Sequence, residues 1–160
     1  MTAPFNTGPG SALEPPVRAF RTLLLLAQRL RYLMDDRLRE DGLTTQQAAL
    51  LTAVIALDGP ALGEAAAALQ TTHQNAAQLV AALQRKGLLR VEADPADRRR
   101  RRLIATEANE PFWGARDRGD QDAIASWFAV LSADELATLC SLADRVLQAT
   151  SQRVRSDDQV

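Results

Sequence analysis

The sequence predicts a mainly α-helical fold with one small β-hairpin, in which helices at both ends flank a compact middle part. Three observations support this prediction. Apolar residues recur at the i, i+3, i+4, i+7 spacing of a helix over most of the chain. Two short helical segments in the middle are separated by only a few residues. Two short apolar strands flank the tip Asp94-Pro95-Ala96-Asp97, which five consecutive arginines follow.

The totals suit one domain with a real core, since the chain has 160 residues and a net charge of only −1. The charge is unevenly distributed. Residues 85–102 carry eight Lys/Arg against three Asp/Glu, and residues 103–160 carry five against ten. A local cationic block suits nucleic-acid binding, and an acidic helical tail suits self-association. No run of 18 apolar residues and only one cysteine are present, so we expect a cytoplasmic protein without a membrane span or a disulfide framework.

The first helix is predicted from Pro15 to about Asp41, because proline tolerates a first helical turn and Gly42 suits a helix end. It has a single apolar stripe, which suits packing against one partner surface. The next helix starts with Thr44 and Gln47 at capping-box spacing and ends at residues 58–60, where the sequence is Asp-Gly-Pro.

Two helices follow, at about 62–69 and 72–86, and the short turn between them makes a helix-turn-helix. In the second of these, Ala76, Leu79, Val80 and Leu83 form the inward face. Strands are predicted at 88–92 and 101–105, and Thr106 is a suitable N-cap for the following helix. A further apolar stripe at 124–131 precedes the final helix, which the Ser132–Glu135 capping box opens.

The segment 43–106 resembles the winged helix-turn-helix of the MarR family of bacterial transcription regulators. The pieces that carry the resemblance are LTTQQAALL, LGEAAAALQTTHQNAAQLVAALQRKGLL and DPADRRRRRLIATE. The last is the most specific, because the family's wing typically reads D-P-x-D-R-R, an apolar strand, and then a threonine that starts a long helix. Four positions depart from the pattern, two of them where alanine (Ala65 and Ala105) replaces a frequent leucine. Gln70 stands where the turn often has glycine, and Asn109, which tolerates left-handed geometry, also replaces a common glycine.

The resemblance implies a homodimer that binds a pseudo-palindromic operator in double-stranded DNA and acts as a transcriptional regulator, more often a repressor in such families. Residues 43–106 would be the DNA-binding part, and residues 15–41 and 107–155 would form the dimerisation helices of the same single domain. A small aromatic or phenolic ligand often binds between these parts and lowers DNA affinity. Tyr32, Phe112 and Trp113 are our candidates for lining such a site, although aromatics on amphipathic helices are more often dimer core.

Polar, uncharged residues at the start of the second helix can read base edges in the major groove, since Gln and Asn bond bidentately to adenine. The candidates are Thr72, His73, Gln74, Asn75 and Gln78. The alternative is a solvated helix start. In the wing, Arg98, Arg99 and Arg100 are the candidates for phosphate or groove contacts, and by family position Asp97 would orient them. Arg101 and Arg102 are expected to lie on the strand faces.

Other classes of function have little support. The sequence has no phosphate-cradling glycine loop, nucleophile elbow or His-carboxylate set, so we expect no enzyme and no cofactor. One histidine and one cysteine do not supply a metal site. Cys140 falls on an apolar stripe, where it is expected to act as a small buried hydrophobe. Two alternatives remain open: a ligand-independent DNA-binding protein, and a winged-helix protein-interaction module without DNA binding.

Overall fold

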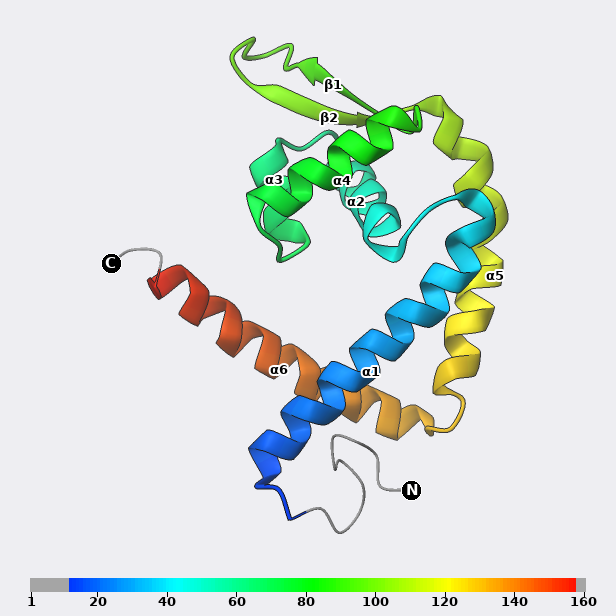
Figure 1. Cartoon of the computed structure of the whole chain (residues 1–160), viewed down its shortest axis with the longest axis vertical. Coiled ribbons are helices and arrows are strands. Elements are labelled where there is room, and N and C mark those ends of the chain that lie inside the picture. Colours follow the sequence, from blue (N-terminus) through cyan, green and yellow to red (C-terminus); the bar gives the residue numbers. More distant parts are fainter. Residues whose placement is uncertain (1–11, 158–160) are drawn as a thin grey trace. The chain divides into compact units, whose positions relative to one another are not determined.

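The computed structural model describes residues 12–157, and the side chains of residues 12–109 and 119–151 among them. The chain forms two compact units that divide between Asn109 and Glu110, and each unit is described by itself. The first unit holds four α-helices, a two-stranded sheet and two short 3-10 helices (Figure 1). The second unit holds two long helices. The predicted fold class, mainly helical with a small β-wing, is confirmed.

Helix α1 runs from Pro15 to Leu38 and continues into the 3-10 helix η1 (Arg39–Asp41). Gly42 ends it with a φ of +66°, as its place after the last helical residue predicts. A side chain of α1 reaches the next helix: Asp35 Oδ1 accepts both the N–H and the hydroxyl of Thr45, each at 2.6 Å. Leu38 is the one residue of α1 that is fully buried.

Helix α2 (Thr45–Ala56) begins with the predicted capping box, in which Thr44 and Gln47 exchange hydrogen bonds of 3.3 Å. Helices α3 (Leu62–Ala68) and α4 (His73–Arg85) follow within two residues of their predicted bounds. Their apolar faces meet α2 in one core, as predicted for α4. Its members are Leu38, Leu43, Leu50, Leu51, Val54, Ala65, Ala66, Ala76, Leu79, Val80, Leu83, Leu89 and Leu103.

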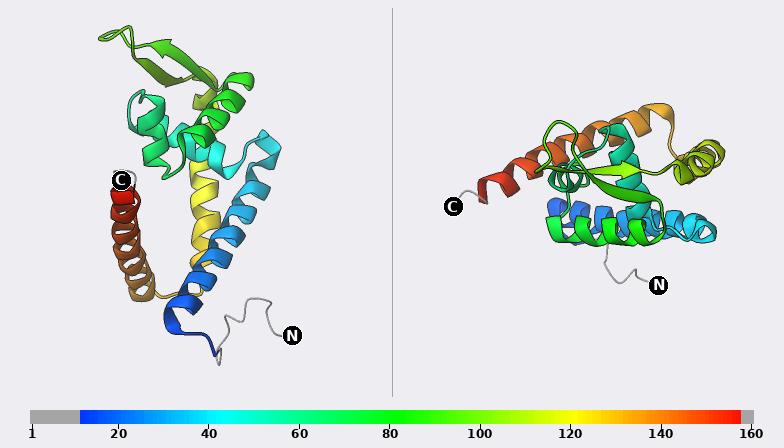
Figure 2. Two further views of the ribbon diagram at one scale, coloured as in Figure 1. Left: turned by 60° about the vertical axis from the view of Figure 1, so that its left-hand side comes forward. Right: turned by 90° about the horizontal axis from the view of Figure 1, so that it is seen from above.

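Strands β1 (Leu89–Ala93) and β2 (Arg101–Ala105) pair antiparallel, with Leu89 opposite Ala105 and Ala93 opposite Arg101. Leu89 and Leu103 point into the core, so the sheet is attached to the helices at the end remote from its tip. Figure 2 shows the hairpin tip projecting beyond helices α3 and α4. This is the geometry of a wing beside a helix-turn-helix.

Two residues at the end of the wing have side-chain partners that the sequence did not predict. Thr106 directly precedes the 3-10 turn η2 (Glu107–Asn109), and its hydroxyl donates to Gly87 O (2.7 Å). Asn109 does not take a left-handed conformation. It is buried, and its side-chain amide donates to Leu88 O at 2.6 Å and Thr106 O at 2.9 Å. Both residues therefore fasten the exit of β2 to the entry of β1.

The second unit consists of α5 (Glu110–Phe128) and α6 (Ala133–Asp157). The predicted capping box opens α6, since Ser132 N–H donates to Glu135 Oε2 (2.8 Å) and Glu135 N–H donates to Ser132 Oγ (3.3 Å). Cys140 is exposed, contrary to the prediction that it is buried. Among the described helices none is by itself long and apolar enough to cross a membrane, and the α5–α6 pair passes that test only jointly, across a 95° bend.

Candidate nucleic-acid interface

The polar start of α4 is organised by its own side chains. Thr72 is the N-cap, and its hydroxyl accepts the Asn75 N–H at 3.1 Å. Asn75 in turn donates its side-chain amide to Thr71 Oγ1 at 2.8 Å. Two of the five predicted base-reading residues are therefore already engaged in holding the helix start. His73, Gln74 and Gln78 are exposed, and Ala77 beside them is half-buried.

The turn before α4 has a left-handed residue. Gln70 has a φ of +50°, and around it Gln70 N–H donates to Ala67 O (3.1 Å) and Thr71 N–H donates to Ala66 O (3.0 Å). This pair of hydrogen bonds is a Schellman motif, in which the residue after the C-cap is usually glycine. Gln70, which stands where glycine is frequent, thus has a backbone conformation that favours glycine. The turn that it forms fixes where α4 begins.

The wing tip is closed by its own hydrogen bonds. Asp94 N–H donates to Arg100 O and Arg100 N–H donates to Asp97 O, both at 2.9 Å. The two carboxylates act within the loop: Asp94 Oδ1 accepts the Ala96 N–H, and Asp97 Oδ1 accepts the Arg99 N–H, again at 2.9 Å. Asp97 therefore holds the backbone of Arg99 rather than a guanidinium.

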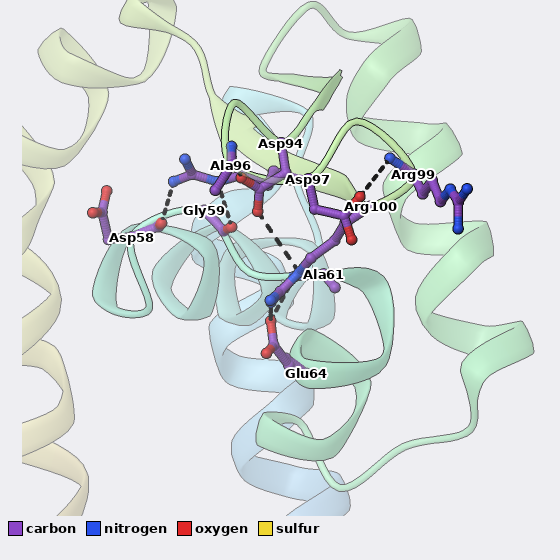
Figure 3. Close-up of polar contacts among 10 residues, drawn as sticks. Asp58, Gly59, Ala61, Glu64, Asp94, Ala96, Asp97, Arg99 and Arg100 are labelled. Carbon is purple, nitrogen blue, oxygen red and sulfur yellow. Dashed lines mark hydrogen bonds and ion pairs between the residues drawn. The ribbon is translucent and has the colours of Figure 1, made fainter.

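The five wing arginines divide into two sets. Arg98 and Arg99 are exposed, and neither side chain takes part in a polar contact with the described residues; Figure 3 shows Arg99 directed away from Glu64 and Arg100. The other three are engaged within the first unit. Arg100 Nη2 lies 2.5 Å from Glu64 Oε2, and Arg101 Nη2 donates to Val91 O at 3.2 Å.

Arg102 fastens the base of the wing. Its guanidinium donates to Gly59 O (3.0 Å) and Asp58 O (2.6 Å), and the neighbouring Leu103 N–H donates to Pro60 O (2.9 Å). A Cβ on Gly59 would lie 2.5 Å from Arg102 Nη2, and Gly59 also has a φ of +79°. The α2–α3 loop is therefore shaped to receive this arginine, which sequence reasoning placed only on a strand face.

Glu64, which the sequence did not single out, has two partners. Its Oε2 accepts the Ala61 N–H at 2.7 Å, at the start of α3, and also faces Arg100 (Figure 3). The backbone N–H of Ala61 and then the Arg100 guanidinium hold the pKa of Glu64 below its usual value of 4.5. Glu64 is therefore a carboxylate at neutral pH and joins α3 to the wing.

A hollow of about 540 Å³ lies between α3, the α2–α3 loop and the wing. Its walls include the apolar residues Leu57, Pro60, Ala67 and Ala68, and the paired side chains of Glu64 and Arg100 also line it. The predicted ligand-site residues are elsewhere. Tyr32 is exposed on α1 with the Arg29 guanidinium 5.7 Å from its ring centre, and Phe112 and Trp113 lie outside the residues whose side chains are described.

Within the described residues, no group of three or more His, Cys, Asp or Glu side chains is arranged to hold a metal ion.

Residues 41–100 match the model of the MarR family. The whole fold is similar to solved MarR-type structures. With the Staphylococcus aureus MepR–DNA complex the TM-score is 0.73 at 21% identity, covering 81% of this chain and 96% of that one. With a mutant of Escherichia coli MarR complexed with operator DNA it is 0.74 at 22% identity, covering 80% of this chain and 92% of that one.

The Streptomyces coelicolor PcaV regulator in complex with its natural ligand gives a TM-score of 0.71 at 26% identity, covering 89% of this chain and 98% of that one. No curated protein sequence matches the chain.

Proposed function

We propose that the chain is a winged-helix transcriptional regulator of the MarR family, whose model matches residues 41–100, and that it binds a pseudo-palindromic DNA operator as a homodimer. Residues 43–106 bind the DNA, and residues 15–41 and 107–155 form the dimer. The observation that carries the proposal is the pairing of two surfaces on one compact unit. The start of α4 exposes His73, Gln74 and Gln78, and the wing exposes Arg98 and Arg99.

The two surfaces suit different tasks. Neutral hydrogen-bonding side chains at a helix start discriminate base edges in a major groove, whereas exposed arginines bind phosphates or enter a narrow minor groove. Thr72 and Asn75 support the helix start through the cap, so we assign them to positioning α4 as well as to any direct contact. Arg98 and Arg99 supply most of the salt-dependent affinity.

A dimer is supported by the apolar surfaces that the long helices leave open. Helix α1 buries only Leu38, while Phe20 is 66% exposed and Leu23 and Leu24 are each 44% exposed. Helix α6 exposes Leu142 (51%) and Val146 (54%). A row of large apolar side chains along an amphipathic helix marks a protein–protein contact, because a lone helix of this kind gains its stability by packing.

Regulation by a small aromatic ligand is the finer part of the proposal. Relatives of similar fold support it: PcaV is described with its natural ligand, and Bordetella bronchiseptica BpsR is regulated in DNA binding by 6-hydroxynicotinic acid. A ligand that prefers one dimer geometry weakens DNA binding by its differential affinity, typically about 1–3 kcal/mol. If aromatic acids and phenols leave the affinity for selected DNA unchanged, the ligand-independent alternative holds.

Selection from a pool of random duplexes tests the function itself. The bound fraction is expected to be enriched in an inverted repeat whose half-sites lie about one helical turn, roughly 34 Å, apart. A chain that binds the pool weakly and enriches no sequence would instead be a protein-interaction module of the same fold. The oligomeric state, measured by sedimentation at the same concentration, decides whether the binding species is a dimer.

A further inference from the structure

The ion pair between Glu64 and Arg100 joins two parts of the first unit that are far apart in the sequence. Glu64 lies on the first turn of α3, and Arg100 closes the wing tip, 36 residues further along the chain. The Arg100 Nε also lies 3.8 Å from Asp94 Oδ2, on the opposite end of the same tip. Arg100 is therefore attached both to its own loop and to α3.

Packing does little to place the tip. The hollow beneath the wing is lined by Ala67 and Ala68 of α3, whose short side chains leave the space unfilled. The base of the wing has separate anchors in Arg102 and in the Leu103 N–H, both bound to carbonyls of the α2–α3 loop. Beyond that base, the position of the tip relative to α3 depends on the polar contact of Arg100 with Glu64.

The hydrogen bonds within residues 94–100 close the tip into a loop, so its residues are held together as one unit. Arg98 and Arg99 are carried on that loop and are free of polar contacts with the described residues, while Arg100 is occupied. Holding Arg100 against α3 thus sets where the other two arginines stand relative to α4.

We propose that Glu64 is a wing-positioning residue: by binding Arg100 it presents Arg98 and Arg99 to DNA, and Arg100 acts as an anchor rather than a phosphate contact. The inference rests on the proposed DNA-binding function. The expected change in DNA affinity on loss of Glu64 has an unusual sign. Loss of an acidic residue from a DNA-binding surface ordinarily strengthens DNA binding, because it removes a repulsion. Loss of Glu64 weakens it.

The variant Glu64→Gln tests this, because its amide oxygen can still accept the Ala61 N–H and keep the start of α3 capped. The matched control is Glu107→Gln, which removes the same charge from an exposed residue of the same unit. A half-exposed ion pair is worth about 1.4- to 5-fold in an equilibrium, so two of them in a dimer predict that Glu64→Gln binds a duplex about 2- to 30-fold more weakly. The control is expected to bind as tightly as the parent or slightly more tightly.

The salt dependence separates an anchor from a phosphate contact. Arg98→Ala in both protomers removes two phosphate contacts and is expected to flatten the slope of log K against log salt by about 1.8. Arg100→Ala should lower affinity without this change of slope, and adding Glu64→Gln to it should cost nothing further. Glu64→Gln binding as tightly as the parent, or Arg100→Ala flattening the slope like Arg98→Ala, overturns the proposal.

A measurement on the free protein, without DNA, tests the position of the wing tip independently of DNA binding. Hydrogen exchange of the Arg99 and Arg100 amides in the free protein should accelerate in Glu64→Gln and not in Glu107→Gln. If no duplex binds the parent, the proposed function fails while exchange still decides whether Glu64 holds the wing tip. Unchanged exchange of these amides means that Glu64 does not position the tip.

Discussion

Gln70 offers a quantitative test of how the helix-turn-helix is built. The Schellman motif recurs at the ends of α2, α3 and α4, and the residue in its left-handed position is Asp58 (φ +50°), Gln70 (φ +50°) and Gly87 (φ +71°) respectively. Glycine adopts this conformation without penalty, and aspartate tolerates it comparatively well. Glutamine is the residue least suited to the position, so Gln70→Gly should stabilise the protein.

The magnitude follows from two opposing effects. An L-residue in the left-handed region costs about 1–2 kcal/mol, which Gln70→Gly relieves. Glycine also makes the unfolded chain more flexible, which offsets about 0.4–1 kcal/mol of that gain. The middle values of these two ranges, about 1.5 and about 0.7 kcal/mol, give an expected net gain of about 0.8 kcal/mol, or roughly 2–3 °C in Tm for a chain of this size. Gln70 is exposed, so its side chain contributes little that is lost.

Urea denaturation of the parent, Gln70→Gly and Gln70→Ala at one fixed protein concentration measures this, because dimer stability depends on concentration. Alanine keeps the left-handed penalty and trims the same side chain, so Gln70→Ala should stay within about 0.5 kcal/mol of the parent. A Gln70→Gly variant no more stable than Gln70→Ala would show that the turn carries no strain.

The remaining predictions concern the interface. Arg99→Ala should weaken binding to all duplexes and flatten the salt slope, whereas Gln74→Ala should relax preference only at particular base pairs; equal effects of both on selected and random DNA would contradict the assignment. Thr72→Ala removes the cap of α4 and should cost about 1 kcal/mol in urea denaturation, the reverse sign to that expected at Gln70. NMR titration should find the pKa of Glu64 below 4.5, held there by the N–H that it caps and by Arg100, and Arg100→Ala should raise it only part of the way. Because the folded-state pKa is lowered, this stabilisation is present above about pH 4.5 and is lost as the pH falls through the folded-state value.

Local signals in the sequence predicted the helix ends and the core. The capping boxes at Thr44 and Ser132 and the helix stop at Gly42 are all found where the short-range pattern places them. These features depend on residues three to five positions apart, which the sequence shows directly. The inward face of α4 was predicted for the same reason, since one helical repeat determines it.

Contacts across long separations were beyond sequence reasoning. Nothing in the run of five arginines shows that Arg100 meets Glu64 or that Arg102 meets the α2–α3 loop, because those partners lie 36 to 44 residues away. The partners of Thr106 and Asn109 were missed for the same reason, since both side chains bond back to residues just before β1. The predicted roles of the polar residues on α4 stay predictions.

Salt titration of duplex binding tests whether this unit holds the phosphates of duplex DNA through its wing. With Arg98 and Arg99 from each of two protomers making four contacts, log K is expected to fall with log salt at a slope of about −3.6 or steeper. A slope near zero would mean that the wing makes no phosphate contacts.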